Sequence, residues 1–176
     1  MLFRSLDQPT TGEVYINGRR TDQMKKNELA ALRNETLGFV FQFHYLLPEF
    51  SALENVLMPQ RIQTGRVSED RLKRAHELMD LVGLTKVKNN LATNMSGGQQ
   101  QRTAIARALM NDPKIILADE PTGNLDSDST ETIYNLLRDI NQQMGTTFVV
   151  ITHDRRIAEK ADRIIEIKDG RIALDI

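Results

Sequence analysis

The chain has 176 residues with 23 Lys and Arg against 24 Asp and Glu, and this balance gives no reason to expect a nucleic-acid partner or binding to an anionic lipid surface. The hydrophobic fraction of 40% is ordinary for a globular protein and allows one sizeable core. The absence of cysteine excludes disulfides, thiol nucleophiles and thiolate metal sites, and no apolar run approaches the ~20 residues of a membrane span. We therefore expect a soluble, cytosolic protein.

The first quarter of the chain predicts a hairpin, a helix and a strand. Residues 12–21 indicate two strands around Asn17–Gly18, which is a strong hairpin signal. Residues 22–34 are a polar helix candidate. The run "LGFVFQ" at 37–42 is a short apolar strand that ends in Gln42.

The middle of the chain is predominantly helical in its pattern. Residues 49–62 predict a helix in their first part that ends near Pro59, because proline lacks the amide hydrogen that a helix interior needs. Residues 68–84 form a clear amphipathic pattern that Ser68 can cap. The next helix begins in the stretch "NMSGGQQQRTAIARAL" at 94–109.

This fourth helix has an unusual start. Ser96 is a good N-cap, but two glycines follow it, and glycine inside a helix costs about 1 kcal/mol relative to alanine. The exposed N–H groups of a helix N-terminus attract anions, phosphate above all. Taken alone, the stretch is better explained as an ordinary glycine-containing turn before a helix.

The last third alternates strands and helices. Apolar runs at 114–120 and 146–154 predict strands, residues 127–144 predict a helix, and residues 162–176 predict two strands around Asp169–Gly170. Apolar strands that alternate with helices favour an α/β fold with a mostly parallel sheet. We expect residues 1–42 and 111–176 to form this α/β core, with a helical subdomain at 43–110 inserted into it.

Polar side chains end three of the apolar runs. Gln42, Asp119–Glu120 and His153 follow predicted strands, and ligands bind outside the C-terminal ends of parallel strands. These residue types suit metal-assisted phosphoryl transfer: Asp119 for Mg²⁺, Gln42 for the metal or the water, Glu120 to polarise the attacking water, His153 for the terminal phosphate. Singly, each has an ordinary interpretation as a loop residue, a cap or a structural histidine. Together with a phosphate-type helix N-terminus they favour a functional site.

The same residues carry a family resemblance. The chain resembles the nucleotide-binding subunits of ATP-binding-cassette (ABC) transporters, a P-loop NTPase-like (RecA-like) fold. The matching motifs, in chain order, are "FVFQ" (39–42) for the Q-loop, "MSGGQQQR" (95–102) for the signature, "IILADEPT" (115–122) for Walker B with the catalytic glutamate, "GNLDSDS" (123–129) for the D-loop and "ITHD" (151–154) for the H-loop.

The resemblance implies a mechanism and partners. Two such subunits would form a homodimer with two ATP molecules and Mg²⁺ between them. Ser96, Gly97, Gly98 and Gln99 would face the terminal phosphate held by the other subunit, and Asp126 would lie at the same seam. Integral membrane permease subunits would dock near residues 43–50, which puts the protein on the cytoplasmic face of the bacterial inner membrane.

Within the family, the stretch at 37–59 is similar to the lipoprotein-releasing ATPases of Gram-negative bacteria. Relatives that drive macrolide export or act in cell division share much of this pattern. Chromosome-maintenance and DNA-repair ATPases also use signature and Walker B motifs, but they need long coiled coils, which the sequence does not contain.

One family motif is absent from the sequence: there is no G-x-x-x-x-G-K-[ST] phosphate loop and no Gly-Lys pair. In the family a stretch like residues 2–14 directly follows that loop, so we expect the chain to be N-terminally truncated and to bind ATP weakly or not at all as written. Two hypotheses stay open: part of a working transporter ATPase, or a degenerate, non-hydrolytic interaction module that lends only its signature helix.

Overall fold

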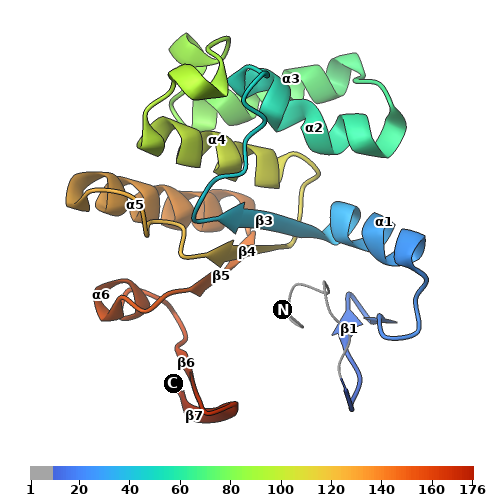
Figure 1. Cartoon of the computed structure of the whole chain (residues 1–176), viewed down its shortest axis with the longest axis vertical. Helices are drawn as coiled ribbons and strands as arrows, with labels where there is room; N and C mark the ends of the chain where they lie inside the picture. Colours follow the sequence, from blue (N-terminus) through green and yellow to red (C-terminus); the bar gives the residue numbers. More distant parts are fainter. Residues whose placement is uncertain (1–9) are drawn as a thin grey trace.

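A three-stranded parallel sheet lies at the centre of the molecule (Figure 1). The computed structural model describes residues 10–176. The sheet has the order β3 (Leu37–Phe41), β4 (Ile115–Asp119), β5 (Thr147–Ile151), and all three strands are apolar runs that the sequence predicts as strands. The expected α/β fold with a parallel sheet is confirmed.

The register of this sheet brings its polar strand ends level with one another. Phe41 pairs with Asp119, and Asp119 pairs with Ile151. Gln42 and Glu120, which come next in the chain, therefore leave the sheet at the same edge. This is the edge at which the sequence places the candidate site.

Two long helices cover one face of the sheet. They are α4 (Gly97–Leu109) and α5 (Ser127–Met144), and their buried side chains form a common core with Val40 of β3 and Ala118 of β4. Ile105 of α4 is completely buried in this core. Since alternate strand residues point to the same face, the pattern of the core agrees with the pleat of the strands.

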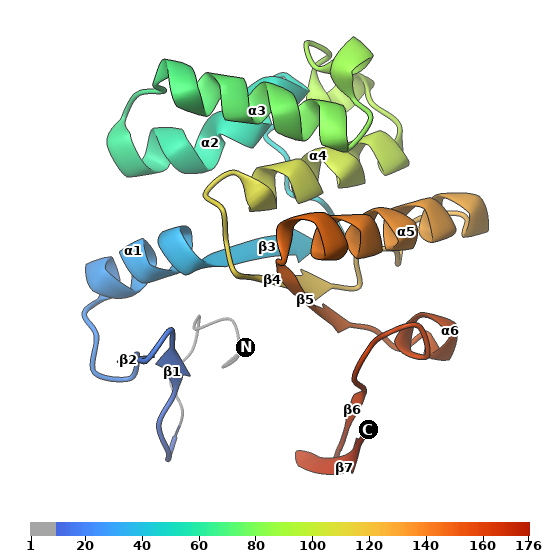
Figure 2. The same ribbon diagram turned by 180° about the vertical axis from the view of Figure 1, so that it is seen from behind.

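Two further helices pack on the outer side of α4. In Figures 1 and 2, α2 (Ala52–Thr64) and α3 (Glu69–Leu81) form a layer above α4, which lies between them and the sheet. Ser68 caps α3 as predicted, accepting a hydrogen bond from the amide of Arg71 at 3.3 Å. The remaining helical segments are α1 (Lys26–Thr36), α6 (Arg155–Ala158) and the short 3-10 helices η2 (Thr85–Val87) and η3 (Ala92–Asn94).

The prediction that the second helix ends near Pro59 was wrong. Helix α2 runs through Pro59 to Thr64 and ends at Gly65, whose positive φ of 73° closes the last turn. Pro59 removes one backbone hydrogen bond, but Val56, Leu57 and Gln60 on either side of it are buried. Packing against α3 and α4 therefore outweighs the local preference of proline to end a helix.

Two small antiparallel hairpins lie near the two ends of the described residues, as the sequence predicts. Their strands are β1 (Tyr15–Ile16), β2 (Arg19–Arg20), β6 (Ile165–Lys168) and β7 (Arg171–Asp175). Both turns use left-handed residues, at Asn17–Gly18 and Asp169–Gly170, as a two-residue hairpin turn requires.

Within residues 10–176, no helix combines the length and the apolar character that crossing a bilayer demands.

The close approach of α4 to β3 can be tested with one methyl group. A Cβ at Gly38 would lie 2.7 Å from the carbonyl oxygen of Ala108 and 2.7 Å from Ile116 Cγ1. We expect Gly38→Ala to lower the free energy of unfolding by about 1–3 kcal/mol, because a backbone oxygen cannot move aside cheaply. Urea denaturation measures this change.

The matched control is Gly97→Ala, where the added Cβ would meet only Leu125 Cδ2 at 3.5 Å, an ordinary contact. Its unfolding free energy should equal that of the parent or exceed it by up to about 1 kcal/mol, because alanine is the better helix former. Equal losses in the two variants would refute the close-packing argument.

Candidate active site

Glu120 and His153 are in direct contact at the C-terminal edge of the sheet. His153 Nδ1 lies 2.7 Å from Glu120 Oε1, and the backbone N–H of His153 donates to the same oxygen at 3.0 Å. The hydroxyl of Thr152 donates to Glu120 Oε2 at 3.3 Å. The loop after β5 therefore holds the carboxylate that follows β4, as the convergence of strand ends predicts.

The electrostatics of this pair favour a charged histidine. The hydrogen bond to Glu120, and then its negative charge, raise the pKa of His153 above the ordinary value. The imidazole is 88% exposed and the Glu120 side chain 22% exposed. Because Nδ1 faces the carboxylate, protonation leaves an N–H donor at Nε2, on the far side of the ring.

Gln42 is held by the loop that follows Glu120. Its Nε2 donates to Asn124 Oδ1 at 3.2 Å, and Asn124 Nδ2 donates to the Gln42 carbonyl oxygen at 3.3 Å. Gly123 lies against the Gln42 amide, and its own N–H donates to the carbonyl of Glu120 at 3.0 Å. Gln42 and Glu120 are thus joined through one turn.

Asp119 is the last residue of β4 and lies level with Phe41 and Ile151. Among residues 10–176, no group of three or more His, Cys, Asp or Glu side chains is placed to hold a metal ion by itself. Asp119 and Gln42 offer one carboxylate and one amide oxygen, which are hard donors. Such a sparse oxygen set fits Mg²⁺ that takes its other ligands from phosphates and water.

The fourth predicted helix begins as expected, at an exposed N-terminus. Ser96 is the N-cap of α4, and its Oγ accepts from the Gln99 amide at 3.3 Å while Gln99 Oε1 accepts from the Ser96 amide at 3.0 Å. This reciprocal capping box uses the Gln99 carbonyl oxygen within the chain. Ser96 and Gly97 at the start of this turn are exposed.

The two glycines of this turn are not required by the described part of their own chain. Neither Gly97 nor Gly98 has a positive φ. A Cβ at Gly97 or Gly98 would meet its nearest neighbours, Leu125 and Ser129, at 3.5 and 3.6 Å, which are ordinary contact distances. Glycine at these positions leaves the backbone of the first turn without side chains to cover it.

Asp126 lies beside this helix start and has a local role. It is the N-cap of α5, accepting from the Ser129 amide at 2.8 Å and from the Ser129 hydroxyl at 3.1 Å. These bonds lower the pKa of Asp126. The structure thus brings Asp126 next to Gly98 through Ser129, while Glu120, His153 and Gln42 form a separate group at the strand ends.

An apolar groove of about 500 Å³ lies beside the loop after β3. Phe39 and Phe41 of β3, Tyr45, and Ile62 of α2 line it, and Ile62 is 74% exposed. Arg107 of α4 fixes the loop, because its guanidinium donates at 2.6 Å to the carbonyls of residues 44 and 45, both of which have positive φ.

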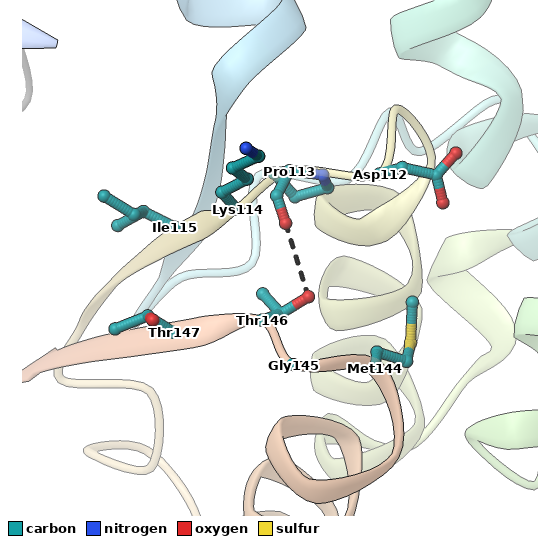
Figure 3. Close-up of a pocket in the computed structure, with 8 residues that line it drawn as sticks. All are labelled: Asp112, Pro113, Lys114, Ile115, Met144, Gly145, Thr146 and Thr147. Atoms are coloured by element: carbon teal, nitrogen blue, oxygen red, sulfur yellow. Dashed lines mark hydrogen bonds between the residues drawn. The ribbon is translucent and has the colours of Figure 1, made fainter. Parts of the chain in front are cut away.

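A second cavity, of about 450 Å³, lies at the opposite end of the strands (Figure 3). It is lined by residues 112–115 and 144–147, where β4 and β5 begin. The buried hydroxyl of Thr146 donates to the Pro113 carbonyl at 3.3 Å and ties the two strand starts together. This cavity is remote from the candidate site, and its contacts serve the sheet.

This fold and these strand-end residues define an ATP-binding cassette, and residues 1–123 match the family described as ABC transporter, to which the chain belongs. It is 53% identical over 168 residues to the lipoprotein-releasing system ATP-binding protein LolD 1 of Rhodopseudomonas palustris, covering 96% of this chain and 74% of that protein. It is 49% identical to LolD of Anaeromyxobacter dehalogenans, covering 99% of this chain and 73% of the relative.

A solved structure gives the same result. The structure is similar to the ATP-binding cassette MJ0796 in a dimeric, post-hydrolysis state bound to ADP and Pi, with a TM-score of 0.86 and 45% identity. The match covers 99% of this chain and 77% of that chain.

Sequence reasoning missed Gly123, Asn124 and Thr152 as site residues. Gly123 and Asn124 lie in the stretch "GNLDSDS", where a Gly-Asn pair is typical of an ordinary turn. Their position between Glu120 and Asp126 was the available signal. Only the folded chain shows that this turn reaches back to Gln42.

The pKa values of His153 and His44 should shift in opposite directions, for different reasons. His153 should titrate above the ordinary pKa of about 6.5, whereas burial lowers the pKa of His44. Stabilisation from the pair is thus fully present below pH ~6.5 and lost as the pH rises through the raised pKa of His153. An NMR titration of both imidazoles measures this directly.

In Glu120→Gln, the pKa of His153 should fall toward the ordinary value while His44, which does not contact Glu120, serves as the internal control. A His153 that titrates below His44 in the parent protein would contradict the contact.

Proposed function

We propose that this chain is the ATP-binding and ATP-hydrolysing subunit of a transporter that drives lipoprotein release. The contact between Glu120 and His153 carries the proposal, because it joins a base and a phosphate-facing imidazole at the C-terminal edge of a parallel sheet. The names of the two LolD relatives support lipoprotein as the substrate over the macrolide-export and cell-division alternatives.

In this proposal Glu120 polarises the attacking water. Its Oε1 is engaged by His153, and Oε2 accepts a long bond of 3.3 Å from Thr152, which leaves acceptor capacity for a water molecule. His153 donates from Nε2 to the terminal phosphate, and its raised pKa favours the protonated ring that can do so.

Asp119 and Gln42 are proposed to hold Mg²⁺ with ATP. The bound metal would supply Lewis-acid neutralisation of the phosphate oxygens. Asp119 contributes from the end of β4 and Gln42 from the end of β3, two neighbouring strands of the sheet. Both donors are oxygens, which agrees with the preference of this cation.

A second copy of the chain is proposed to complete the site. Ser96, Gly97, Gly98 and Gln99 would present the N-terminus of α4 to the phosphate held by the partner, with Asp126 at the seam. The support is that neither glycine is needed sterically within the described residues, so the bare turn is free for an external anion. MJ0796, a similar cassette, is dimeric and bound to ADP and Pi.

The apolar groove is proposed as the docking site for an integral membrane permease. In this proposal residues 43–110 act as the helical subdomain and residues 1–42 and 111–176 as the α/β core, with the groove between them. The groove is lined by exposed apolar side chains such as Tyr45 and Ile62, which is typical of a protein-binding surface. Docking there would hold the subunit at the cytoplasmic face of the inner membrane.

The base assignment predicts that Glu120→Gln abolishes ATP turnover in the native protein but keeps ATP-dependent dimerisation, because the amide cannot accept the proton of water. Turnover is measured by phosphate release and dimerisation by analytical ultracentrifugation with and without ATP. Glu77→Gln on α3, an exposed carboxylate, is the matched control and should keep the turnover of the parent protein.

Unchanged hydrolysis in Glu120→Gln would refute the role of Glu120. No hydrolysis in the parent protein, with a normal association with an intact cassette subunit, would instead favour the non-hydrolytic interaction module.

The groove assignment predicts that Ile62→Glu weakens permease binding at least tenfold. Binding would bury the introduced carboxylate, and the apolar contact of Ile62, about 1.5–3 kcal/mol, would be lost. Co-purification of the detergent-solubilised complex measures this loss. Ile172→Glu on β7 changes an isoleucine that is also well exposed, at 66%, and should leave the complex intact. Equal retention of the permease by both variants would overturn the assignment.

A further inference from the structure

Two reciprocal hydrogen bonds connect Gln42 to Asn124, 82 residues later in the chain. The Gln42 side chain donates from Nε2 to Asn124 Oδ1 at 3.2 Å, and Asn124 Nδ2 donates to the Gln42 backbone carbonyl at 3.3 Å. The second bond fixes which way the Asn124 amide points, since its nitrogen must face that carbonyl. Asn124 Oδ1 is then an acceptor, and only the nitrogen end of the Gln42 amide can bond to it.

This arrangement determines where the oxygen of Gln42 points. Because Nε2 faces Asn124, Oε1 is directed away from the turn and is available to a cation. A free glutamine amide samples both orientations, and one of them presents N–H groups that repel a metal ion. From these bonds we propose that Asn124 is a positioning residue that presents the Gln42 oxygen to Mg²⁺; the inference rests on the proposed function.

Gly123 also affects the position of the Gln42 side chain. A Cβ at this position would lie 2.7 Å from Gln42 Nε2, 3.1 Å from Cδ and 3.3 Å from Cγ. All three atoms belong to a flexible side chain, and Gly123 has no positive φ. Gly123→Ala should therefore displace the Gln42 amide at little cost to folding.

The turn also links metal positioning to the base. The Gly123 N–H donates to the Glu120 carbonyl at 3.0 Å, and the Leu125 N–H donates to the Thr122 carbonyl at 3.1 Å. Two overlapping hydrogen-bonded turns, 120–123 and 122–125, thus carry Glu120 at one end and Asn124 near the other.

The test compares Mn²⁺ affinity in four variants of the native protein, each saturated with a non-hydrolysable ATP analogue: Gln42→Ala, Asn124→Leu, Gly123→Ala and Gln143→Leu. Electron paramagnetic resonance of free Mn²⁺ gives the affinity, and thermal melting reports folding. Asn124 and Gln143 are both exposed polar amides, so Gln143→Leu on α5 is the matched control.

We expect Gln42→Ala, Asn124→Leu and Gly123→Ala each to weaken Mn²⁺ binding roughly tenfold, as loss of an outer-shell partner does. Melting temperatures should stay near that of the parent, and Gln143→Leu should bind Mn²⁺ normally. A double variant of residues 42 and 124 should be no weaker than Gln42→Ala alone, because Asn124 acts only through the Gln42 oxygen, which Gln42→Ala already removes.

The positioning role is overturned if Gln42→Ala weakens Mn²⁺ binding while Asn124→Leu and Gly123→Ala bind it like the parent protein. That pattern leaves the proposed function intact. If Gln42→Ala itself binds Mn²⁺ normally, the metal role of Gln42 in the proposed function fails, and the positioning of its oxygen fails with it.

Discussion

The direct packing of α4 on β3 is the constraint on which the rest of the structure depends. Gly38 allows this contact, because any side chain there would meet the carbonyl of Ala108. With α4 fixed on the sheet, its N-terminus lies beside the turn before α5, and its Arg107 reaches the loop that lines the apolar groove. One helix therefore connects the exposed turn at its N-terminus to the apolar groove near its other end.

The candidate site has two parts that form for different physical reasons. Glu120 and His153 meet because the ends of neighbouring parallel strands meet, and their interaction is electrostatic. The start of α4 depends instead on what it omits, since its glycines leave backbone N–H groups exposed without serving a steric need in the described chain. Under the proposed function the first part acts on the nucleotide of its own subunit and the second on that of its partner.

The sequence predicted most of this arrangement. Its predictions were wrong or incomplete where contacts between distant residues determine the structure. Apolar runs and turn pairs such as Asn17–Gly18 were sufficient for the strands and hairpins, because these signals are local. Pro59 was misjudged because burial of its neighbours keeps α2 intact, and a local rule cannot include that energy. Asn124 escaped notice because its partner, Gln42, is 82 residues away and no periodicity connects them.

The backbone of Glu120 shows a conflict between folding and activity. Its φ of 45° lies in the left-handed region, which glycine and asparagine adopt more easily than glutamate, at a difference of about 1 kcal/mol or more. The hydrogen bonds that His153 and Thr152 make to its carboxylate offset part of this cost. The residue that is proposed to polarise water is therefore held in place by its side-chain partners against the preference of its own backbone.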